Sequence, residues 1–349
     1  MQKEKGTALL SVLMMLSLLL PLAAHVVLQA QLDLLMARNF QDHTDAFYLA
    51  EAGLEQALAT LGTTATMARL LQGPDGVANT KDDGELGLAP ALSGLDDKRG
   101  YAVRVMPSAA GRFEIVSSGR GRQGAQRAVA AVIELGEAPY TPAAFYFGGE
   151  AAQLVFDAAH LQVWSPATTD SAVDRPPPAL AVTRTDIAEP AQRQHPGLPI
   201  TTAAPRDASA LRSAIDALLQ QTAARHLPAG PGPTQLGTAA APQLTIADGD
   251  LTISTATAGS GILLVRGALS ITTSLRFDGL LIVLGDCALN PAAELNLSGA
   301  LWQPSPHAVA QLNGRGVIEY NRDGLAQADA AAPGILPHAL RVLGRREVT

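Results

Sequence analysis

The stretch Gly6-Thr-Ala-Leu-Leu-Ser-Val-Leu-Met-Met-Leu-Ser-Leu-Leu-Leu-Pro21 decides the fold of the N-terminal part of this chain. Lys3 and Lys5 precede it, and no residue with a fixed charge occurs from position 8 to position 30. A helix of about 20 apolar residues spans the hydrocarbon core of a bilayer, and the lysines favour a cytoplasmic N-terminus. Helix-forming residues continue to about Leu61 without the cleavage pattern of a secretory signal peptide. The pattern therefore predicts one long helix, half of it in a membrane.

A second informative stretch lies on the same expected helix, Asn39-Phe-Gln-Asp-His-Thr-Asp-Ala-Phe-Tyr-Leu-Ala-Glu-Ala-Gly-Leu-Glu-Gln-Ala-Leu58. Together with the basic leader that ends in Gly6, it resembles the N-terminal region of type IV pilins and type II secretion pseudopilins, in particular of PilX-type minor pilins. The resemblance covers residues 1 to about 135. It implies that a prepilin peptidase cuts between Gly6 and Thr7, and that the new N-terminus is methylated.

The resemblance also implies a location and a set of partners. The protein is expected in the bacterial inner membrane, single-pass with its C-terminal domains in the periplasm, and later in a pilus or pseudopilus at the cell surface. The expected partners are other minor and major pilins, the prepilin peptidase, the inner-membrane assembly machinery and membrane lipid.

Two positions depart from the pattern of this family. The mature chain would begin with Thr7 where most pilins have Phe, and its fifth residue is Ser11 where most have Glu. A carboxylate buried in lipid is expensive unless it is paired, and in the family it is thought to meet the N-terminal amine of a neighbouring subunit. A subunit without it resembles the tip pseudopilin of type II secretion, which implies a position at or near the fibre tip.

The composition limits the classes of function. The 349 residues give room for two soluble domains beside the helix. A formal net charge of −7 offers no basic surface, so we expect no nucleic-acid partner. The single cysteine, Cys287, excludes an internal disulfide, and we expect it in the core. The alternative, a reactive thiol, requires a nearby base that the sequence does not show.

Residues 73–95 form a polar insert that begins Gly73-Pro-Asp-Gly-Val-Ala-Asn-Thr-Lys-Asp-Asp-Gly-Glu85. Five oxygen-bearing side chains lie close together in it: Asp75, Asn79, Asp82, Asp83 and Glu85. Hard oxygen ligands at flexible spacing suit calcium, although this spacing is not that of an EF-hand. The sequence leaves two alternatives open, a calcium site and a solvated acidic loop, and we expect no other cofactor.

Three strands are expected after the insert. Residues 101–106 and 112–117 alternate between apolar and polar, Ala109-Ala-Gly111 supplies a turn between them, and residues 126–134 form the third strand. In pilin-like proteins the long helix packs on such an antiparallel meander. The resemblance therefore implies a pilin head over residues 63–138.

The signals weaken from residue 139 to residue 242. Pro176-Pro-Pro178 and Pro231-Gly-Pro233 indicate loops or extended linkers. One helix is expected over residues 207–219, with Asp207 as a candidate N-cap and with an apolar face. We expect a Pro-rich connecting region whose helix caps one end of the domain that follows.

An internal repeat occupies the C-terminal part of the chain. Three pentapeptides recur every 18 residues: Gly249-Asp-Leu-Thr-Ile253, Gly267-Ala-Leu-Ser-Ile271 and Gly285-Asp-Cys-Ala-Leu289. A fixed period of short strands punctuated by glycine predicts a stacked solenoid, here a parallel β-helix. The inward ladder at its core is expected to contain Leu251, Leu269 and Cys287. Gly261 and Gly279 keep the same step, whereas Gly299 follows after 20 residues, which indicates an insertion.

The sequence favours a structural scaffold over an enzyme. Polysaccharide lyases and hydrolases also use parallel β-helices, but they need clustered carboxylates or a metal on one face. Asp250 and Asp286 share a register, yet the coil between them has Ala268 at that position, and the histidines show no metal-ligand spacing. We therefore expect a non-enzymatic protein, with a tethered solenoid hydrolase as a rival class.

The expected architecture is α+β, a long N-terminal transmembrane helix with an antiparallel β-meander head, followed by a short parallel β-helix. The expected domains are the leader (1–6), the transmembrane and amphipathic pilin helix (7–62), the pilin head (63–138), the connecting region (139–242) and the β-solenoid (243–349). The expected function is that of a minor pilin or pseudopilin in type IV pilus or type II secretion assembly. The alternative is a pilin-anchored surface adhesin or glycan-binding β-helix protein, which requires an exposed aromatic or polar patch on the solenoid.

Overall fold

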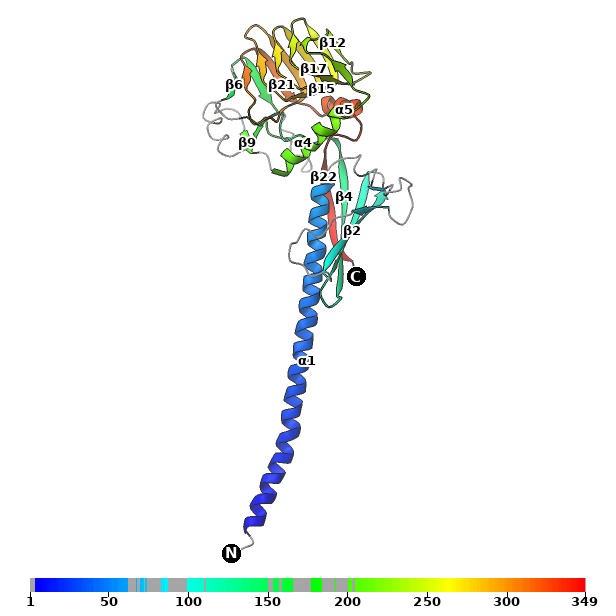
Figure 1. Cartoon of the computed structure of the whole chain (residues 1–349), viewed down its shortest axis with the longest axis vertical. Helices are drawn as coiled ribbons and strands as arrows, with labels where there is room; N and C mark the ends of the chain where they lie inside the picture. The colour runs from blue at the N-terminus through cyan, green and yellow to red at the C-terminus, as the bar shows by residue number, and fades with distance from the viewer. Residues whose placement is uncertain are drawn as a thin grey trace. The chain divides into compact units, whose positions relative to one another are not determined.

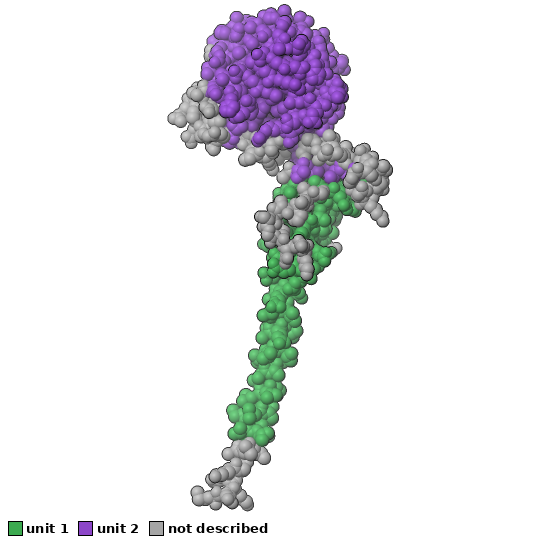
Figure 2. Space-filling view, in the orientation of Figure 1, with its two compact units in different colours: residues 1–57, 80–133, 342–349 green, residues 58–79, 134–341 purple. Residues whose placement is uncertain are grey.

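The structure is a computed structural model that describes residues 4–61, 67, 70–71, 73, 83–86, 99–109, 111–149, 153–156, 159–165, 177–183, 192, 200–202 and 205–348. The chain forms two compact units, coloured separately in Figure 2. Unit 1 comprises residues 1–57, 80–133 and 342–349, and unit 2 comprises residues 58–79 and 134–341. The chain thus leaves unit 1, builds unit 2 and returns to unit 1 at its C-terminus, an order that the expected tandem domains do not anticipate.

Helix α1 (Glu4–Thr60) is 57 residues long, which confirms the predicted long helix (Figure 1). Pro21 lies inside it. Proline removes one backbone donor, and the helix continues on both sides of it. Every side chain from position 12 to position 41 is exposed, whereas buried residues recur at helical spacing from Asp42 onward. The two halves of α1 therefore have different surroundings within this chain.

Unit 1 contains most of a five-stranded sheet whose order is β1-β2-β3-β4-β22. Its strands are β1 (Glu85–Leu86), β2 (Gly100–Ala109), β3 (Arg112–Arg120), β4 (Gln126–Pro139) and β22 (His338–Val348). The three predicted strands correspond to β2, β3 and β4. β2 and β3 are antiparallel, and Gly111 in the turn between them has a positive φ of 70°. The last strand, β22, completes the sheet from the far end of the chain.

Unit 2 contains a β-solenoid, which confirms that prediction. An 11-stranded sheet follows the path β10 (Arg225–Leu227), β13 (Gln243–Ala247), β15 (Thr257–Val265), β17 (Ser274–Val283), β19 (Glu294–Gln303), β5 (Phe145–Phe147), β8 (Leu180–Val182) and β9 (Ile200–Thr202), with β12 (Gln235–Leu236), β21 (Arg315–Tyr320) and β7 (Leu161–Trp164) off this path. A six-stranded sheet follows β11 (Gly230–Pro231), β14 (Leu251–Ile253), β16 (Leu269–Ile271), β18 (Cys287–Leu289), β20 (Ala310–Leu312) and β6 (Leu154–Phe156). The pairs along both paths are parallel.

The 18-residue period is the stacking register of the coils. Leu251 pairs with Leu269, and Leu269 pairs with Cys287. Gly261, Gly279 and Gly299 stack on one another with φ of 115°, 146° and 146°. A Cβ at Gly279 would lie 2.0 Å from the carbonyl oxygen of Gly261. Both the backbone conformation and the close approach therefore require glycine at the point where each long strand passes from one face of the solenoid to the next.

The coils do not follow one another in sequence order. β5 pairs with β19, with Phe145 opposite Leu301, and β8 and β9 continue the stack beyond β5. The chain then passes through helix α4 (Pro205–Leu219) to β10, which lies at the opposite end of the sheet. Residues 139–242, expected as a connecting region, thus supply strands at both ends of the solenoid. These strands have two to four residues, too few to show a periodic pattern.

Helices α4 and α5 (Arg322–Ala331) cover one outer face of the 11-stranded sheet (Figure 1). Leu211, Ile215 and Leu218 of α4 belong to one buried cluster with outward side chains of the sheet such as Ile262 and Leu280. The prediction that this helix caps one end was therefore wrong. The strand segments after the recurring glycine of each coil are apolar on both faces and need a covering layer. Asp207 lies inside α4, so it is not the N-cap.

Candidate functional site

The first candidate site is the exposed apolar surface of α1. The large apolar side chains between Val12 and Phe40 are 48 to 74% exposed. Apolar surface in water is unfavourable by about 25 cal/mol per Å², so this surface requires lipid or other apolar helices around it. Ser17, the hydroxyl residue in this run, donates from Oγ to the carbonyl of Met14 at 2.8 Å and therefore has its polar group satisfied within the helix.

Among the described residues, α1 is the helix that is long and apolar enough to cross a membrane. This property is compatible with a single-pass membrane protein or a signal anchor. Gly6, Thr7 and Ser11 lie within the backbone of α1, near its N-terminus. Their roles in processing and assembly stay predictions.

The second candidate site is the stripe by which α1 packs on the sheet of unit 1. The stripe consists of buried residues at helical spacing: Ala46, Ala50, Gly53, Leu54 and Ala57. Three of these come from the segment Ala50 to Glu55 on which the resemblance to PilX-type proteins rests. Small residues on a helix face let two backbones approach closely. That face of the motif therefore has a direct packing role in this chain.

Glycines on the sheet side complete this contact. A Cβ at Gly119 in β3 would lie 2.0 Å from the carbonyl oxygen of Ala46 and 2.5 Å from the amide nitrogen of Ala50. A Cβ at Gly53 of the helix would lie 2.4 Å from the Ser117 hydroxyl oxygen. Both faces are therefore at their closest approach, and neither tolerates added volume without a shift of backbone or side chain.

Asp42 fixes the loop between β3 and β4 to the same helix. Its carboxylate accepts hydrogen bonds from the amides of Gln123 at 2.9 Å and Ala125 at 3.0 Å, and the side chain is buried. The Gln123 amide is the main cause that holds the pKa of Asp42 below its usual 3.8, against the opposing effect of burial. The carboxylate is thus ionised at neutral pH and ties the N-terminal end of the packing stripe to the sheet.

The two glutamates of the same motif bind β22. Arg345 places Nη2 at 2.7 Å from Glu55 Oε1 and Nη1 at 3.6 Å from Glu51 Oε2. Glu51 and Glu55 are one helical turn apart, so one guanidinium reaches both. The pairs are partly exposed and are individually weak, of the order of 1 kcal/mol or less. They nevertheless show that strand β22 contacts helix α1, a pairing that the sequence pattern did not reveal.

No family model, no curated protein and no solved structure matches this chain.

The acidic insert lies largely outside the described residues. Asp75, Asn79 and Asp82 are outside them, whereas Asp83 and Glu85 are described. Glu85 accepts a hydrogen bond from Arg104 Nη2 at 2.8 Å. In the described part of the chain, no group of three or more His, Cys, Asp or Glu side chains is placed to hold a metal ion. The calcium site in this insert stays a prediction.

Cys287 is buried in the solenoid. It lies in register between Leu269 and Ala310, and its neighbours in the ladder point into the same core. Burial, reinforced by the adjacent Asp286 carboxylate, raises the pKa of Cys287 to about 12. Because the thiolate is the reactive form, this side chain is an inert part of the core.

Asp250 and Asp286, which share a register in the repeat, each bind a backbone amide of the coil that follows. Asp250 Oδ1 accepts from the amide of Ala268, and Asp286 Oδ1 accepts from the amide of Val309, both at 2.8 Å. Each aspartate therefore satisfies a backbone donor at a turn. Ala268, which lies between them in the repeat, supplies its backbone N–H as the donor to Asp250.

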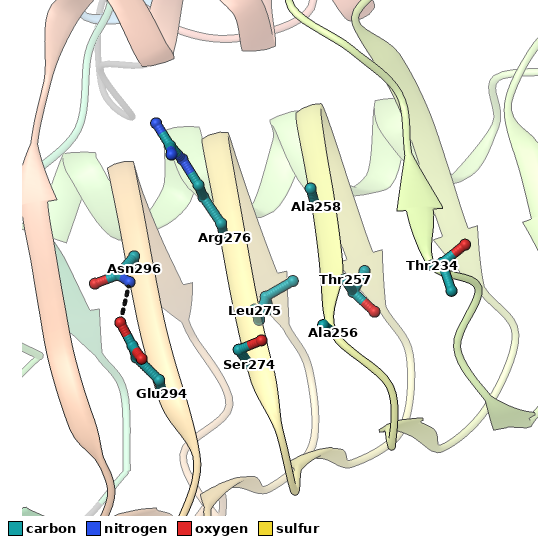
Figure 3. A pocket seen from close by; sticks show the side chains of 9 residues that line it. All are labelled: Thr234, Ala256, Thr257, Ala258, Ser274, Leu275, Arg276, Glu294 and Asn296. Carbon is teal, nitrogen blue, oxygen red and sulfur yellow. Dashed lines mark hydrogen bonds between the residues drawn. The ribbon is translucent and has the colours of Figure 1, made fainter.

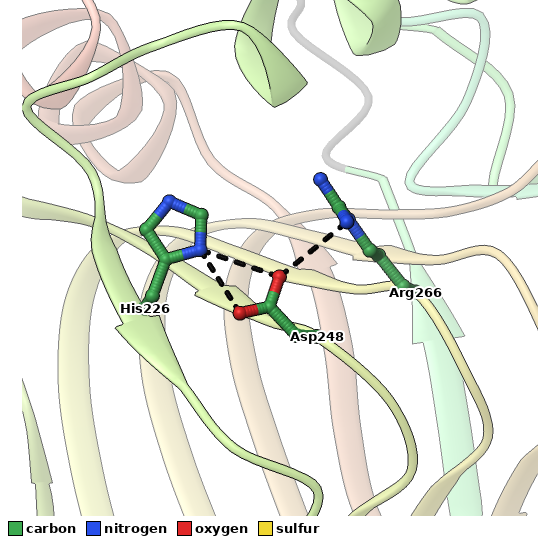
Figure 4. Close-up of polar contacts among 3 residues, drawn as sticks. All are labelled: His226, Asp248 and Arg266. Carbon is green, nitrogen blue, oxygen red and sulfur yellow. Dashed lines mark hydrogen bonds and ion pairs between the residues drawn. The ribbon is translucent and has the colours of Figure 1, made fainter.

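A histidine, an aspartate and an arginine meet on three successive coils (Figure 4). His226 Nδ1 lies 3.0 Å from Asp248 Oδ2, and Arg266 Nη1 lies 3.5 Å from Asp248 Oδ1. All three side chains are more than 40% exposed. The cluster has no hydroxyl or thiol nucleophile among its drawn members, and its geometry is that of a solvated surface ion-pair network.

His338 occupies a buried position where β22 begins. Its Nδ1 lies 2.7 Å from the carbonyl oxygen of Gly136 in β4, and its Nε2 lies 3.2 Å from Asp329 Oδ1 in α5. Both partners are acceptors, so the imidazolium form, with two N–H donors, satisfies both contacts. Burial alone lowers the pKa of His338, but the Asp329 carboxylate and the Gly136 carbonyl outweigh it, and the net pKa is raised above 6.5.

Proposed function

We propose that this chain is a membrane-anchored, non-enzymatic minor pilin or pseudopilin that takes part in assembly of a type IV pilus or a type II secretion pseudopilus. One observation carries the proposal. A single 57-residue helix exposes apolar side chains all round between Val12 and Phe40 and packs its C-terminal part on a β-sheet through small residues. A fibre subunit needs both properties, because its free half must exchange lipid for the helices of neighbouring subunits while its head stays attached.

The proposed mechanism has two stages. In the inner membrane, lipid covers the apolar half of α1, and the units built by residues 42–348 lie in the periplasm. During assembly the same half packs against the apolar helices of other minor and major pilins. Asp42, Gly119 and the packing stripe hold the second half of the helix to the sheet during this transfer. The chain contributes position and shape to the fibre, and no chemical step.

The most direct test of this function is cleavage of the N-terminus by a prepilin peptidase. The peptidase is expected to cut after Gly6, so the mature chain begins at methylated Thr7. Gly6→Val should leave the precursor uncut, because the added side chain obstructs the peptide bond that is cleaved. Ala8→Val adds similar bulk two residues later and serves as the matched control, which should be cut normally.

Mass spectrometry of the N-terminus in a strain that carries a prepilin peptidase gives the readout. A mature chain that starts at a residue other than Thr7, or equal cleavage of the Gly6→Val and Ala8→Val variants, would contradict the assignment. An intact N-terminus in the presence of an active peptidase would contradict it as well.

We further propose a position at or near the fibre tip. Ser11 stands where packed pilins carry a carboxylate that meets the N-terminal amine of a neighbour. A buried amine without a partner is unfavourable by several kcal/mol, and a tip subunit avoids one such contact. Ser11→Glu should then give no gain in fibre assembly. Gold labelling of the solenoid on purified fibres locates the subunit, and label spread evenly along the shaft would refute the tip position.

A further inference from the structure

One outer face of the solenoid carries polar side chains in a regular array. It is formed by the strand segments that precede Gly261, Gly279 and Gly299, together with β21 and β7. The inward residues of these segments, such as Leu275 and Phe277, are buried in the core, and the residues between them point outward. We name this outward surface the polar face. Its members are exposed or half-buried: Arg276, Asp278, Asn296, Arg315, Glu319 and Trp164.

A groove crosses the polar face (Figure 3). It has a volume of about 350 Å³ and is lined by residues in or next to the strands β12, β15, β17 and β19. The short side chains of Ala256 and Ala258 line one side of the groove and leave it open there. On the other side Asn296 Nδ2 donates to Glu294 Oε1 at 2.7 Å, while the Arg276 guanidinium extends away from that pair. The groove therefore runs across the strands, along the direction in which the coils stack.

Trp164 stands at the β7 end of the same face. Glu319 pairs with Trp164 in register, and Asp278 and Ser298 continue that row toward the groove. The Trp164 side chain is 49% exposed, whereas the second tryptophan, Trp302, is fully buried and donates from Nε1 to Thr141. A half-exposed indole presents a large apolar area to water and marks a contact surface. Adjacent strands are about 4.8 Å apart, so the indole and the groove lie along one extended track.

The polar face offers both hydrogen-bond donors and hydrogen-bond acceptors. Arg276 and Arg315 are forks of N–H donors, Asp278 and Glu319 are acceptors, and Asn296 is both. In the described part of the chain, Arg276, Asp278 and Arg315 make no ion pair or side-chain hydrogen bond, so these groups are available to a ligand. The face carries acidic as well as basic groups, which disfavours nucleic acid and other polyanions. Its outward side chains are too polar for an apolar helix or a lipid surface.

We infer that the polar face binds a neutral glycan chain, laid along the coil stack with one sugar ring on Trp164 and the next ones over the groove. A sugar hydroxyl both donates and accepts, so neighbouring hydroxyls match guanidinium, carboxylate and amide groups at once. The apolar faces of sugar rings stack on an indole. This inference stands apart from the proposed function, since a failure to bind glycan leaves the helix and its processing untouched.

The test uses the full chain in a detergent without a sugar head group. The probes are maltohexaose, cellohexaose and chitohexaose, with hexagalacturonate as the acidic counterpart. Tryptophan fluorescence reports binding, because ligand reaches Trp164 while the buried Trp302 contributes a constant signal. Isothermal titration calorimetry measures the same binding without reference to fluorescence.

Three variants make the test specific. Trp164→Ala and Arg276→Ala should each weaken binding by at least about tenfold. Val155→Ala removes another exposed apolar side chain, 48% exposed in β6 of the six-stranded sheet, and should leave the dissociation constant unchanged. Circular dichroism establishes that each variant is folded.

The inference is supported by saturable binding of at least one neutral hexamer that both polar-face variants weaken and the Val155→Ala variant does not. It is overturned if none of the three neutral hexamers binds. Tighter binding of hexagalacturonate than of every neutral hexamer, or binding that Trp164→Ala and Arg276→Ala leave unchanged, overturns it equally.

Discussion

Substitution of Gly119 by alanine tests the contact between α1 and its sheet. The new Cβ would lie 2.0 Å from the Ala46 carbonyl oxygen and 2.5 Å from the Ala50 amide nitrogen. Both obstructing atoms belong to the backbone of α1, so no change of rotamer relieves the overlap. Real Cβ atoms stay at least 3.0 Å from such atoms, and the helix must therefore move away by about 1 Å.

The magnitude follows from the cost of overpacking. Extra volume in a well-packed contact typically destabilises by about 1–3 kcal/mol. Since each 1.4 kcal/mol corresponds to a factor of ten, local opening of residues 46–57 should become roughly 5- to 150-fold more frequent. Hydrogen–deuterium exchange of the full chain, read by mass spectrometry, measures this opening directly. Peptides from β16 and β18 provide an internal reference because their own core surrounds them.

Gly100→Ala is the matched control. Gly100 lies in β2 of the same sheet, and a Cβ there meets no atom within 4 Å. Exchange in residues 46–57 should be unchanged by it. Close packing at Gly119 would be refuted if Gly119→Ala leaves hydrogen exchange of residues 46–57 at the wild-type rate, or if Gly100→Ala accelerates it to the same extent.

Three further predictions concern titratable groups. Alkylation of Cys287 in the folded protein should be at least about a thousandfold slower than in the urea-unfolded chain, since its pKa is raised to about 12; equal rates would contradict its burial. Asp42→Asn should destabilise unit 1 by about 1.5–3 kcal/mol, with the exposed Asp33→Asn as control. The folded pKa of Asp42 is lowered, so its contribution to the free energy of unfolding is present above the unfolded pKa of 3.8 and is lost as pH falls through the folded pKa. An acid unfolding curve that Asp42→Asn leaves unaltered would refute this. The pKa of His338 is raised in the folded protein. Its contribution to the free energy of unfolding is therefore complete below pH 6.5, the unfolded pKa, and is lost as pH rises through the folded pKa. Melting scans from about pH 5 to about pH 9 should show this loss in the wild type and in His226→Gln but not in His338→Gln; a wild-type curve without it would contradict the assignment.

Much of the fold could be predicted from the sequence where a long regular pattern existed. The uncharged run from Ala8 to Ala30 is long enough to identify α1, and the 18-residue glycine period identifies the solenoid. The alternation of residues 101–117 identifies a hairpin. In each case many residues repeat one structural requirement, so the pattern survives local exceptions.

The parts that could not be predicted depend on pairing between distant segments. β5 and β8 have three residues each, and their place in the stack is set by partners such as Leu301. The partners of β22 likewise lie far back in the chain, as Arg345 and Glu55 illustrate. Of the candidate site residues, the inward ladder was visible in the repeat, whereas Trp164 was not, because its strand occurs once and outside the period.

The order of the coils has a consequence for how the polypeptide folds as it is synthesised. β5 is synthesised about 150 residues before β19, the strand with which it pairs. β4 is synthesised about 200 residues before its neighbour β22. Contacts of such high sequence separation must close large loops before they contribute any stability, which slows folding. The nascent chain therefore has unpaired strand edges during synthesis, and the five-stranded sheet is complete only when the eleven-residue strand β22 is made. A chaperone that binds unpaired strand edges has that interval in which to act, and a truncation within β22 leaves the five-stranded sheet incomplete.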